Sequence, residues 1–204
     1  MQYSNLIFDI LDKSLKPKGS ASFIVSGGSS PVNIFQEISK MDTDWANIDI
    51  SLVDDRVVSQ THKDSNEKLV SDLLMVNHAS NANFISICND TENLKNVNRP
   101  YTVMLLGMGE DGHFASLFPS LIQSNIEYFD LSAETDIFFT EPMGSPCHRR
   151  VSMNLSMILQ SENIFLLVSS DKKFDVLKKA EYDKNIPLYY LLNQSQKDIN
   201  ILKT

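Results

Sequence analysis

The chain has 204 residues and a formal net charge of −8, with 42% hydrophobic and 22% charged residues. This composition is that of an ordinary globular protein. The acidic excess disfavours nonspecific binding to nucleic acid, which depends on neutralising phosphates, and no apolar run is long enough to span a bilayer. The N-terminal segment mixes charged with apolar residues, unlike a secretory signal. We therefore expect a cytoplasmic protein with a single domain over residues 1–204 and neither nucleic acid nor a membrane as a partner.

Apolar periodicity predicts helices and strands that alternate along the chain. The first is an amphipathic helix over residues 3–15, which should end at Pro17 and Gly19 and bury Leu6, Ile7, Ile10, Leu11 and Leu15. The predicted strands cover residues 21–25, 48–53, 83–87, 101–106, 136–140, 163–169 and 199–202. The remaining predicted helices cover residues 31–40, 65–76, about 153–160 and 172–182. The asparagine-rich segment 89–98 is predicted to be mainly loop.

This alternation predicts an α/β fold with a doubly wound, mostly parallel sheet and helices on both faces, in a Rossmann-like single domain. In such sheets ligands bind beyond the carboxyl ends of the strands, where the connecting loops meet. The functional residues should therefore lie in the segments that follow the predicted strands.

The loop after the first strand contains Gly27, Gly28, Ser29 and Ser30 and runs into a helix. Glycines allow the backbone to pass close to a ligand, serines offer hydroxyl groups, and the start of a helix attracts anions. The loop is therefore a candidate phosphate cradle. A tight turn with Ser30 as the N-cap of the helix explains the same residues equally well.

The second strand ends in Val53, Asp54, Asp55 and Arg56. Arg56 can offer a fork of hydrogen-bond donors to a phosphate, and Asp54 can bind a sugar hydroxyl or orient another catalytic group. The plainer interpretation is a surface ion pair of small energetic weight. The position at the end of a predicted strand favours a functional role.

The segment Gly107–Pro119, "GMGEDGHFASLFP", follows another predicted strand. Imidazole side chains titrate close to neutral pH, so His113 is a candidate general base, and Asp111 can hold its loop or fix its tautomer. The alternative is a structural histidine.

The glycine spacing does not match GxGxxG, and no HxxxH or CxxC spacing indicates a metal. His62, His78 and His148 look like surface residues, and Cys88 and Cys147 like reduced thiols.

Basic residues occur in two later segments. Arg149 and Arg150 precede Val151 and Ser152, and Lys172 and Lys173 follow a predicted strand at the start of a helix. Lysines in a first helical turn oppose the helix dipole. One of them is therefore a candidate for a ligand contact, although a solvated helix face is an equally good explanation.

These motifs, in this order over residues 26–177, resemble the 6-phosphogluconolactonase family. The resemblance implies hydrolysis of 6-phospho-D-glucono-1,5-lactone to 6-phosphogluconate in the oxidative pentose phosphate pathway, by a carboxylic ester hydrolase without a metal or other cofactor. It also implies site residues, with Arg150 favoured over Arg149 because it directly precedes Val151. The implied phosphate loop is Gly27, Gly28, Ser29 and Ser30, the implied cations are Arg56, Arg150 and Lys173, and the implied catalytic residues are His113, Asp54 and Asp111.

Two details separate the chain from glucosamine-6-phosphate deaminase, a relative of this family. The deaminase carries a tyrosine where Arg56 stands, and its histidine is followed by "AFNEP" rather than by Ala115-Ser116-Leu117-Phe118-Pro119. The chain also departs from the lactonase pattern, because Ser30, Asp55 and Phe114 replace threonine, glutamate and threonine, and because it is short.

The mechanism expected from these residues uses His113 to take a proton from water as the water attacks C1 of the lactone. Nearby cations or backbone amides would stabilise the oxyanion, and the imidazolium would then protonate the leaving ring oxygen. The alternatives are an amino-sugar-phosphate isomerase or deaminase and a noncatalytic sugar-phosphate sensor. The expected partner is a small sugar-phosphate lactone, and the protein is expected to be a monomer or a dimer.

Overall fold

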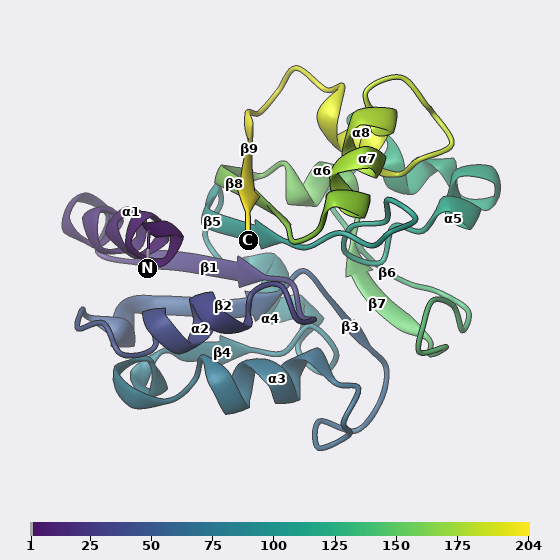
Figure 1. The fold of residues 1–204 in the computed structure, drawn as a ribbon. Coiled ribbons are helices and arrows are strands. Elements are labelled where there is room, and N and C mark those ends of the chain that lie inside the picture. The colour runs from purple at the N-terminus through teal and green to yellow at the C-terminus, as the bar shows by residue number, and fades with distance from the viewer. Residues whose placement is uncertain (1) are drawn as a thin grey trace.

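The computed structural model describes residues 2–204, and its largest element is a six-stranded sheet in which every neighbouring pair is parallel (Figure 1). In spatial order the strands are β4 (Asn83–Ile85), β2 (Ile48–Leu52), β1 (Ala21–Val25), β5 (Tyr101–Leu106), β8 (Ser161–Val168) and β9 (Ile199–Lys203). The chain winds outward from β1 to β4 and then returns to β5 and the opposite edge. The direction of winding therefore reverses between β1 and β5, which is where ligands bind in such sheets.

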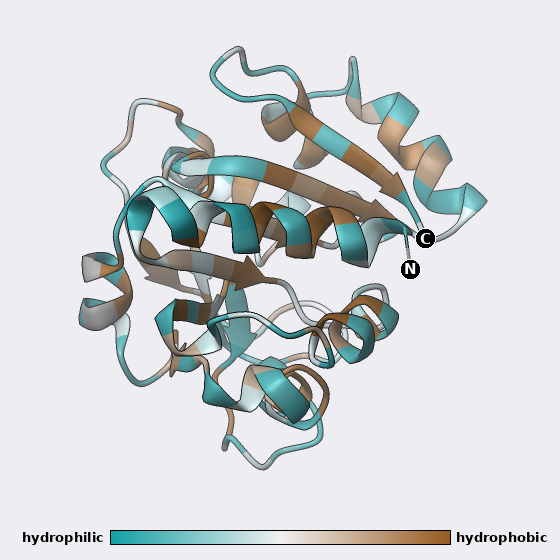
Figure 2. Ribbon diagram, turned by 90° about the vertical axis from the view of Figure 1, so that its left-hand side faces the viewer, coloured by the Kyte–Doolittle hydropathy of each residue, from teal (hydrophilic) through white to brown (hydrophobic). Residues whose placement is uncertain are grey.

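The helices flank the sheet, and α1 packs on both β1 and β5 (Figure 1). Figure 2 shows α1 with alternating hydrophilic and hydrophobic bands beside strands that are mainly hydrophobic. The predicted doubly wound, mostly parallel α/β fold is confirmed. The helices are α1 (Gln2–Lys18), α2 (Val32–Ile38), α3 (Asn66–Leu73), α4 (Thr91–Asn96), α5 (Pro119–Ser124), α6 (Leu155–Ile158), α7 (Asp171–Ala180) and α8 (Leu188–Leu192), with short 3-10 helices at Trp45–Asn47, Asn77–Asn81 and Ile126–Phe129.

The first helix differs from its prediction at two points. Pro17 does not end α1 but lies in its last turn, and the helix stops at Gly19, whose φ of +74° lets its N–H bond to the carbonyl of Leu15 at 2.8 Å. Leu6, predicted to face the core, is exposed, whereas Ile7 and Leu11 are fully buried. The buried stripe is therefore narrower than the apolar periodicity indicates.

A second, antiparallel sheet of three short strands continues from the main sheet. It consists of β3 (Asp54–Arg56), β7 (Arg150–Met153) and β6 (Ile137–Phe139), with β7 in the middle. The predicted strand at 136–140 belongs here rather than in the parallel sheet, and the helix predicted to begin at 153 begins at Leu155, because Met153 ends β7. Val53 joins the sheets: its N–H donates to the carbonyl of Val25 at 2.9 Å, and its carbonyl accepts from Met153 at 3.0 Å.

One cluster of buried apolar side chains includes residues from both sheets, among them Phe23, Leu105, Val151 and Met153. β1 and β5 consist entirely of buried residues, as expected for parallel strands that are covered on both faces. None of the helices within residues 2–204 has the length and apolar character needed to cross a lipid bilayer.

Candidate active site

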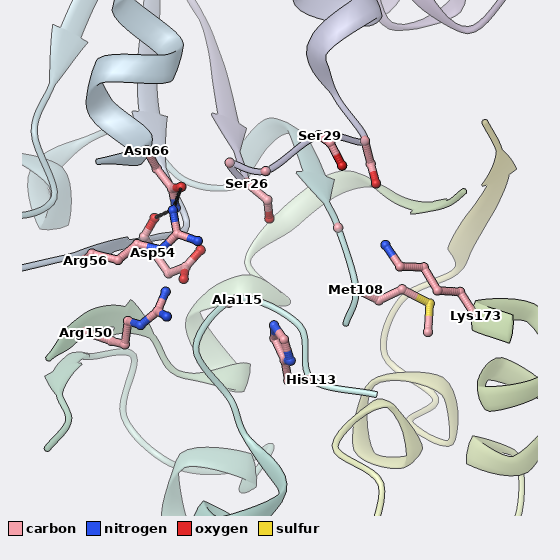
Figure 3. Close-up of a pocket in the computed structure, with 14 residues that line it drawn as sticks. Ser26, Ser29, Asp54, Arg56, Asn66, Met108, His113, Ala115, Arg150 and Lys173 are labelled. Carbon is pink, nitrogen blue, oxygen red and sulfur yellow. Dashed lines mark hydrogen bonds between the residues drawn. The ribbon is translucent and has the colours of Figure 1, made fainter. Parts of the chain in front are cut away.

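A pocket of about 200 Å³ lies beyond the carboxyl ends of β1 and β5, at the reversal of the winding. Figure 3 shows Arg56, Arg150 and Asp54 on one side of it, Ser29 and Lys173 on the other, and His113 between them. All the predicted site residues line this pocket except Asp111, which lies behind His113. The lining residues are Ser26, Gly27, Gly28, Ser29, Ser30, Asp54, Arg56, Asn66, Gly107, Met108, His113, Ala115, Arg150 and Lys173.

The segment that carries His113 is anchored by its aromatic residues. Phe114 is fully buried, and the His113 ring packs against Phe118 with 4.5 Å between the ring centroids. Gly109 is needed for this arrangement, because a Cβ at that position would lie 2.3 Å from the His113 ring. The phenyl group at position 114 therefore fills the core beneath the loop, and packing on both sides restrains the imidazole.

His113 forms a close pair with Asp111. The His113 Nδ1 atom lies 2.5 Å from the Asp111 Oδ1 atom, which also accepts the backbone N–H of His113 at 3.2 Å. Partial burial opposes ionisation of Asp111, but the hydrogen bond and charge of His113 outweigh it and lower the pKa of the carboxyl. With Nδ1 donating to this carboxylate, Nε2 is the nitrogen available to accept a proton.

The two arginines are cross-strand neighbours, because Arg56 on β3 pairs with Arg150 on β7. Arg150 is only 4% exposed. Burial and the charge of Arg56 lower its pKa, and the carboxylates of Asp54 and Asp55 oppose this effect. Like charges directly opposite each other are unfavourable in a sheet, so the pair would be stabilised by an anion in the pocket. Arg149 is exposed and does not line the pocket.

Asn66 holds Arg56 in place. Its Oδ1 atom accepts from Arg56 Nη1 at 2.6 Å, and its Nδ2 atom donates to the carbonyl of Asp54 at 3.0 Å. Gly27 makes room for this amide, since a Cβ at Gly27 would lie 2.0 Å from Asn66 Oδ1. The glycine loop and Asn66, the first residue of α3, are therefore fitted to each other.

Asp54 is buried against the loop that carries His113. Its Oδ2 atom accepts from the Ser116 hydroxyl at 2.6 Å, and the Ser116 N–H donates to the Ser152 hydroxyl at 3.2 Å. Within residues 2–204 it is the one carboxylate that lines the pocket. The hydrogen bond from Ser116 fixes the Asp54 carboxylate as an acceptor on the same side of the pocket as the arginines (Figure 3).

The opposite side of the pocket presents hydroxyl groups and one ammonium. Ser169, which follows β8, accepts from Lys173 Nζ at 3.3 Å and from the Ser30 hydroxyl at 3.2 Å. Burial lowers the pKa of Lys173, and the nearby charge of Glu110 opposes the shift. The Ser26 hydroxyl is buried and has no hydrogen-bond partner within the described chain. This side therefore retains donors for a ligand.

Five lining residues were not among the predicted site residues: Ser26, Asn66, Gly107, Met108 and Ala115. The signal for Asn66 was its place in "DSN", ten positions after Arg56, and that for Ser26 was its place in the glycine loop. Ala115 has a φ of +49°, a region that non-glycine residues rarely adopt. Alanine is not a residue type that favours this conformation, so the sequence gives no signal for Ala115.

Comparison with known proteins agrees with the geometry. Residues 1–200 match the family model described as glucosamine-6-phosphate isomerases/6-phosphogluconolactonase. The 6-phosphogluconolactonase of Neisseria meningitidis serogroup B is 37% identical over 205 residues, covering 93% of this chain and 87% of the relative. That of Helicobacter pylori strain J99 is 35% identical, covering 84% and 77%.

A solved 6-phosphogluconolactonase structure from Shewanella baltica superposes with a TM-score of 0.87 at 30% identity, covering 99% of this chain and 91% of that one. The resemblance found in the motifs is thus confirmed along nearly the whole chain. This chain belongs to the glucosamine-6-phosphate isomerase/6-phosphogluconolactonase family.

Proposed function

We propose that this protein hydrolyses 6-phospho-D-glucono-1,5-lactone to 6-phosphogluconate, as the names of its relatives indicate. The observation that carries the proposal is the His113–Asp111 pair at a pocket that also holds Arg56, Arg150 and Lys173. A base and three cations suit an anionic ester substrate.

In this proposal the cations and the glycine-serine loop bind the phosphorylated lactone and fix its orientation. Binding energy from the phosphate, which is remote from the reacting carbon, then serves to position C1. The buried Asp54 carboxylate accepts a hydrogen bond from a sugar hydroxyl, because Ser116 occupies only one of its oxygens.

His113 Nε2 takes a proton from a water molecule as that water attacks C1, and Asp111 stabilises the imidazolium that forms. The C1–ring-oxygen bond then breaks, and the imidazolium returns the proton to the leaving oxygen. The negative charge on the carbonyl oxygen is stabilised by the cations of the pocket. The mechanism consumes one water and requires no other reactant.

The same pocket argues against an amino-sugar-phosphate deaminase. Moving protons between C1 and C2 requires an additional acid, and among the described lining residues the one carboxylate is Asp54, which the proposal assigns to binding a sugar hydroxyl. We further propose a cytoplasmic enzyme, monomeric or dimeric, that acts on a small sugar-phosphate lactone and not on nucleic acid, since its net charge is −8.

The direct test generates the lactone with glucose-6-phosphate dehydrogenase and follows its loss against the spontaneous rate. The protein is expected to accelerate the loss, and His113→Ala is expected to abolish most of the acceleration. Release of ammonia from glucosamine 6-phosphate would support the deaminase instead. Binding of 6-phosphogluconate without turnover of the lactone would support the noncatalytic sensor.

A further inference from the structure

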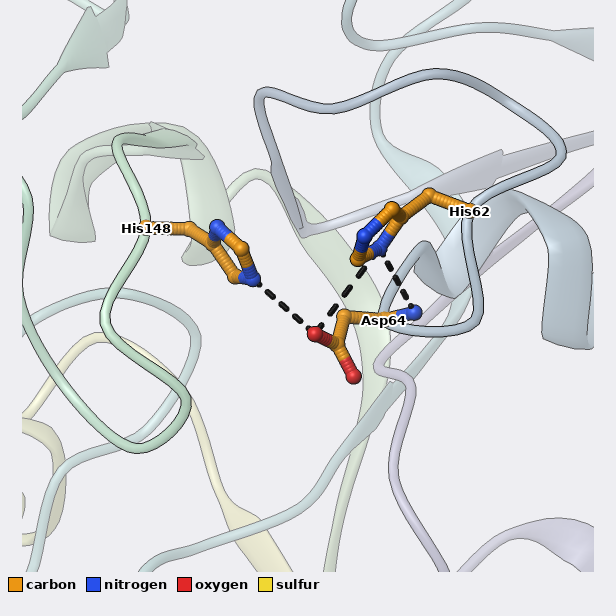
Figure 4. A group of neighbouring side chains, drawn as sticks. All are labelled: His62, Asp64 and His148. Carbon is orange, nitrogen blue, oxygen red and sulfur yellow. Dashed lines mark hydrogen bonds and ion pairs between the residues drawn. The ribbon is translucent and has the colours of Figure 1, made fainter.

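Three side chains from two distant segments of the chain converge on one another (Figure 4), and none of them lines the active-site pocket. His62 and Asp64 lie in the loop between β3 and α3, and His148 lies in the turn before β7. We call these residues the histidine cluster. Asp64 and His148 are 84 positions apart in the sequence, yet His148 Nε2 lies 3.0 Å from Asp64 Oδ2.

The spacing of the three potential ligand atoms is close to that of a tetrahedral metal site. Two ligands with bonds of about 2.1 Å at the tetrahedral angle are about 3.4 Å apart. In the cluster Asp64 Oδ2 lies 3.0 Å from His148 Nε2 and 3.8 Å from His62 Nδ1, and all three atoms lie within 4.8 Å of one another. Small side-chain rotations would therefore bring them to a common ion.

The chemistry of the three groups also suits a metal. His62 Nδ1 accepts a hydrogen bond from the Asp64 N–H at 3.1 Å, so this nitrogen is the unprotonated one, and a metal bond would replace that hydrogen bond at its single lone pair. The side chains are partly exposed, at 40% for His62, 22% for Asp64 and 26% for His148. An ion can therefore reach the cluster, and a water molecule can supply the fourth ligand.

We propose that the histidine cluster binds a divalent transition-metal ion of the zinc class, with two imidazoles, one carboxylate and one water as ligands. Imidazole nitrogen favours zinc and its neighbours over magnesium and calcium, which prefer oxygen ligands. The sequence shows no standard ligand spacing, because the ligands come from two separate segments.

Binding at this position would clamp the two segments that carry the pocket arginines. The carbonyl of Asp64 accepts from Arg56 Nη1 at 2.9 Å, and the carbonyl of Arg149, next to His148, accepts from the Val57 N–H at 2.9 Å. A metal would therefore stiffen the arginine side of the pocket without touching His113. The proposal stands whether or not the protein is a lactonase.

The test measures metal binding directly, on full-length protein treated with a chelator. Zn²⁺ is titrated by calorimetry, and Co²⁺ serves as a probe whose visible absorption reports tetrahedral coordination. One ion per chain is expected, with a melting temperature that rises with Zn²⁺ concentration. His62→Ala and His148→Ala are each expected to weaken binding at least about tenfold and to remove the rise in melting temperature.

Two variants serve as controls. His78→Ala removes an exposed histidine that pairs with Asp42 away from the cluster, and Cys147→Ser removes the exposed thiol beside His148. Both are expected to bind Zn²⁺ as the parent does. The proposal is overturned if the parent shows no saturable binding, if His62→Ala and His148→Ala bind as tightly as the parent, or if Cys147→Ser abolishes binding.

Discussion

Asp111→Asn tests how much the carboxylate behind His113 contributes to the proposed base. Asp111 Oδ1 lies 2.5 Å from His113 Nδ1 and also accepts the His113 N–H at 3.2 Å. Asparagine has nearly the same shape and can still accept through its oxygen. It removes the negative charge that stabilises the imidazolium, and its amide can turn to hold the other tautomer.

The size of the effect follows from the exposure of the pair. A hydrogen bond to a charged group contributes about 1.5–3 kcal/mol, and since the Asp111 side chain is 49% exposed, solvent screening places this pair at the lower end. About 1.5 kcal/mol corresponds to roughly a tenfold decrease in kcat. His113→Ala removes the base altogether, for which we expect a decrease of about 10²- to 10⁴-fold.

Initial rates of lactone loss, corrected for the spontaneous reaction, measure both effects. KM should change little, because neither residue belongs to the proposed cation set. Glu110→Gln is the matched control: it removes one exposed negative charge from the same loop without touching His113. A parental kcat in Asp111→Asn would refute the orienting role, and an equal decrease in Glu110→Gln would assign the effect to the charge of the loop.

The other predictions concern the binding groups of the pocket. Arg150→Met should raise KM about 10- to 100-fold by removing a charged donor, whereas Arg149→Met should leave KM near the parental value because Arg149 is exposed. Gly27→Ala should displace Asn66 and lower stability by about 1–3 kcal/mol, measured by urea unfolding. Burial lowers the pKa of Lys173, so this lysine should lose its positive charge at a lower pH than an ordinary lysine does. Affinity for 6-phosphogluconate, measured by calorimetry, should therefore fall as the pH rises toward the alkaline range, and Lys173→Gln should lack this decrease.

The central strands of the fold could be predicted because they are continuous apolar runs. β1 and β5 have the predicted bounds, 21–25 and 101–106, and all their residues are buried. Since the glycine loop and the His113 loop follow these two strands directly, correct strand ends placed both loops at the same edge of the sheet. The motif order added the chemistry, and it led to the family that the comparisons confirm.

The antiparallel sheet could not be predicted in the same way. β3 and β7 are three and four residues long, and their sequences, Asp54–Arg56 and Arg150–Met153, include charged residues that are typical of loops. They become strands because Val53 bonds to both Val25 and Met153 and thereby extends the backbone on each side. Such pairing between distant segments leaves no local periodicity in the sequence.

This small sheet determines which distant polar groups meet. By pairing β3 with β7 it places Arg56 opposite Arg150 inside the pocket, and by joining Val57 to Arg149 it continues the pairing into the two flanking segments. Those segments bring Asp64 to His148 outside the pocket. The arginine pair and the histidine cluster therefore arise from the same strand register. A one-residue slip of β7 would turn Arg150 to the other face of the small sheet, and it would also move His148 away from Asp64.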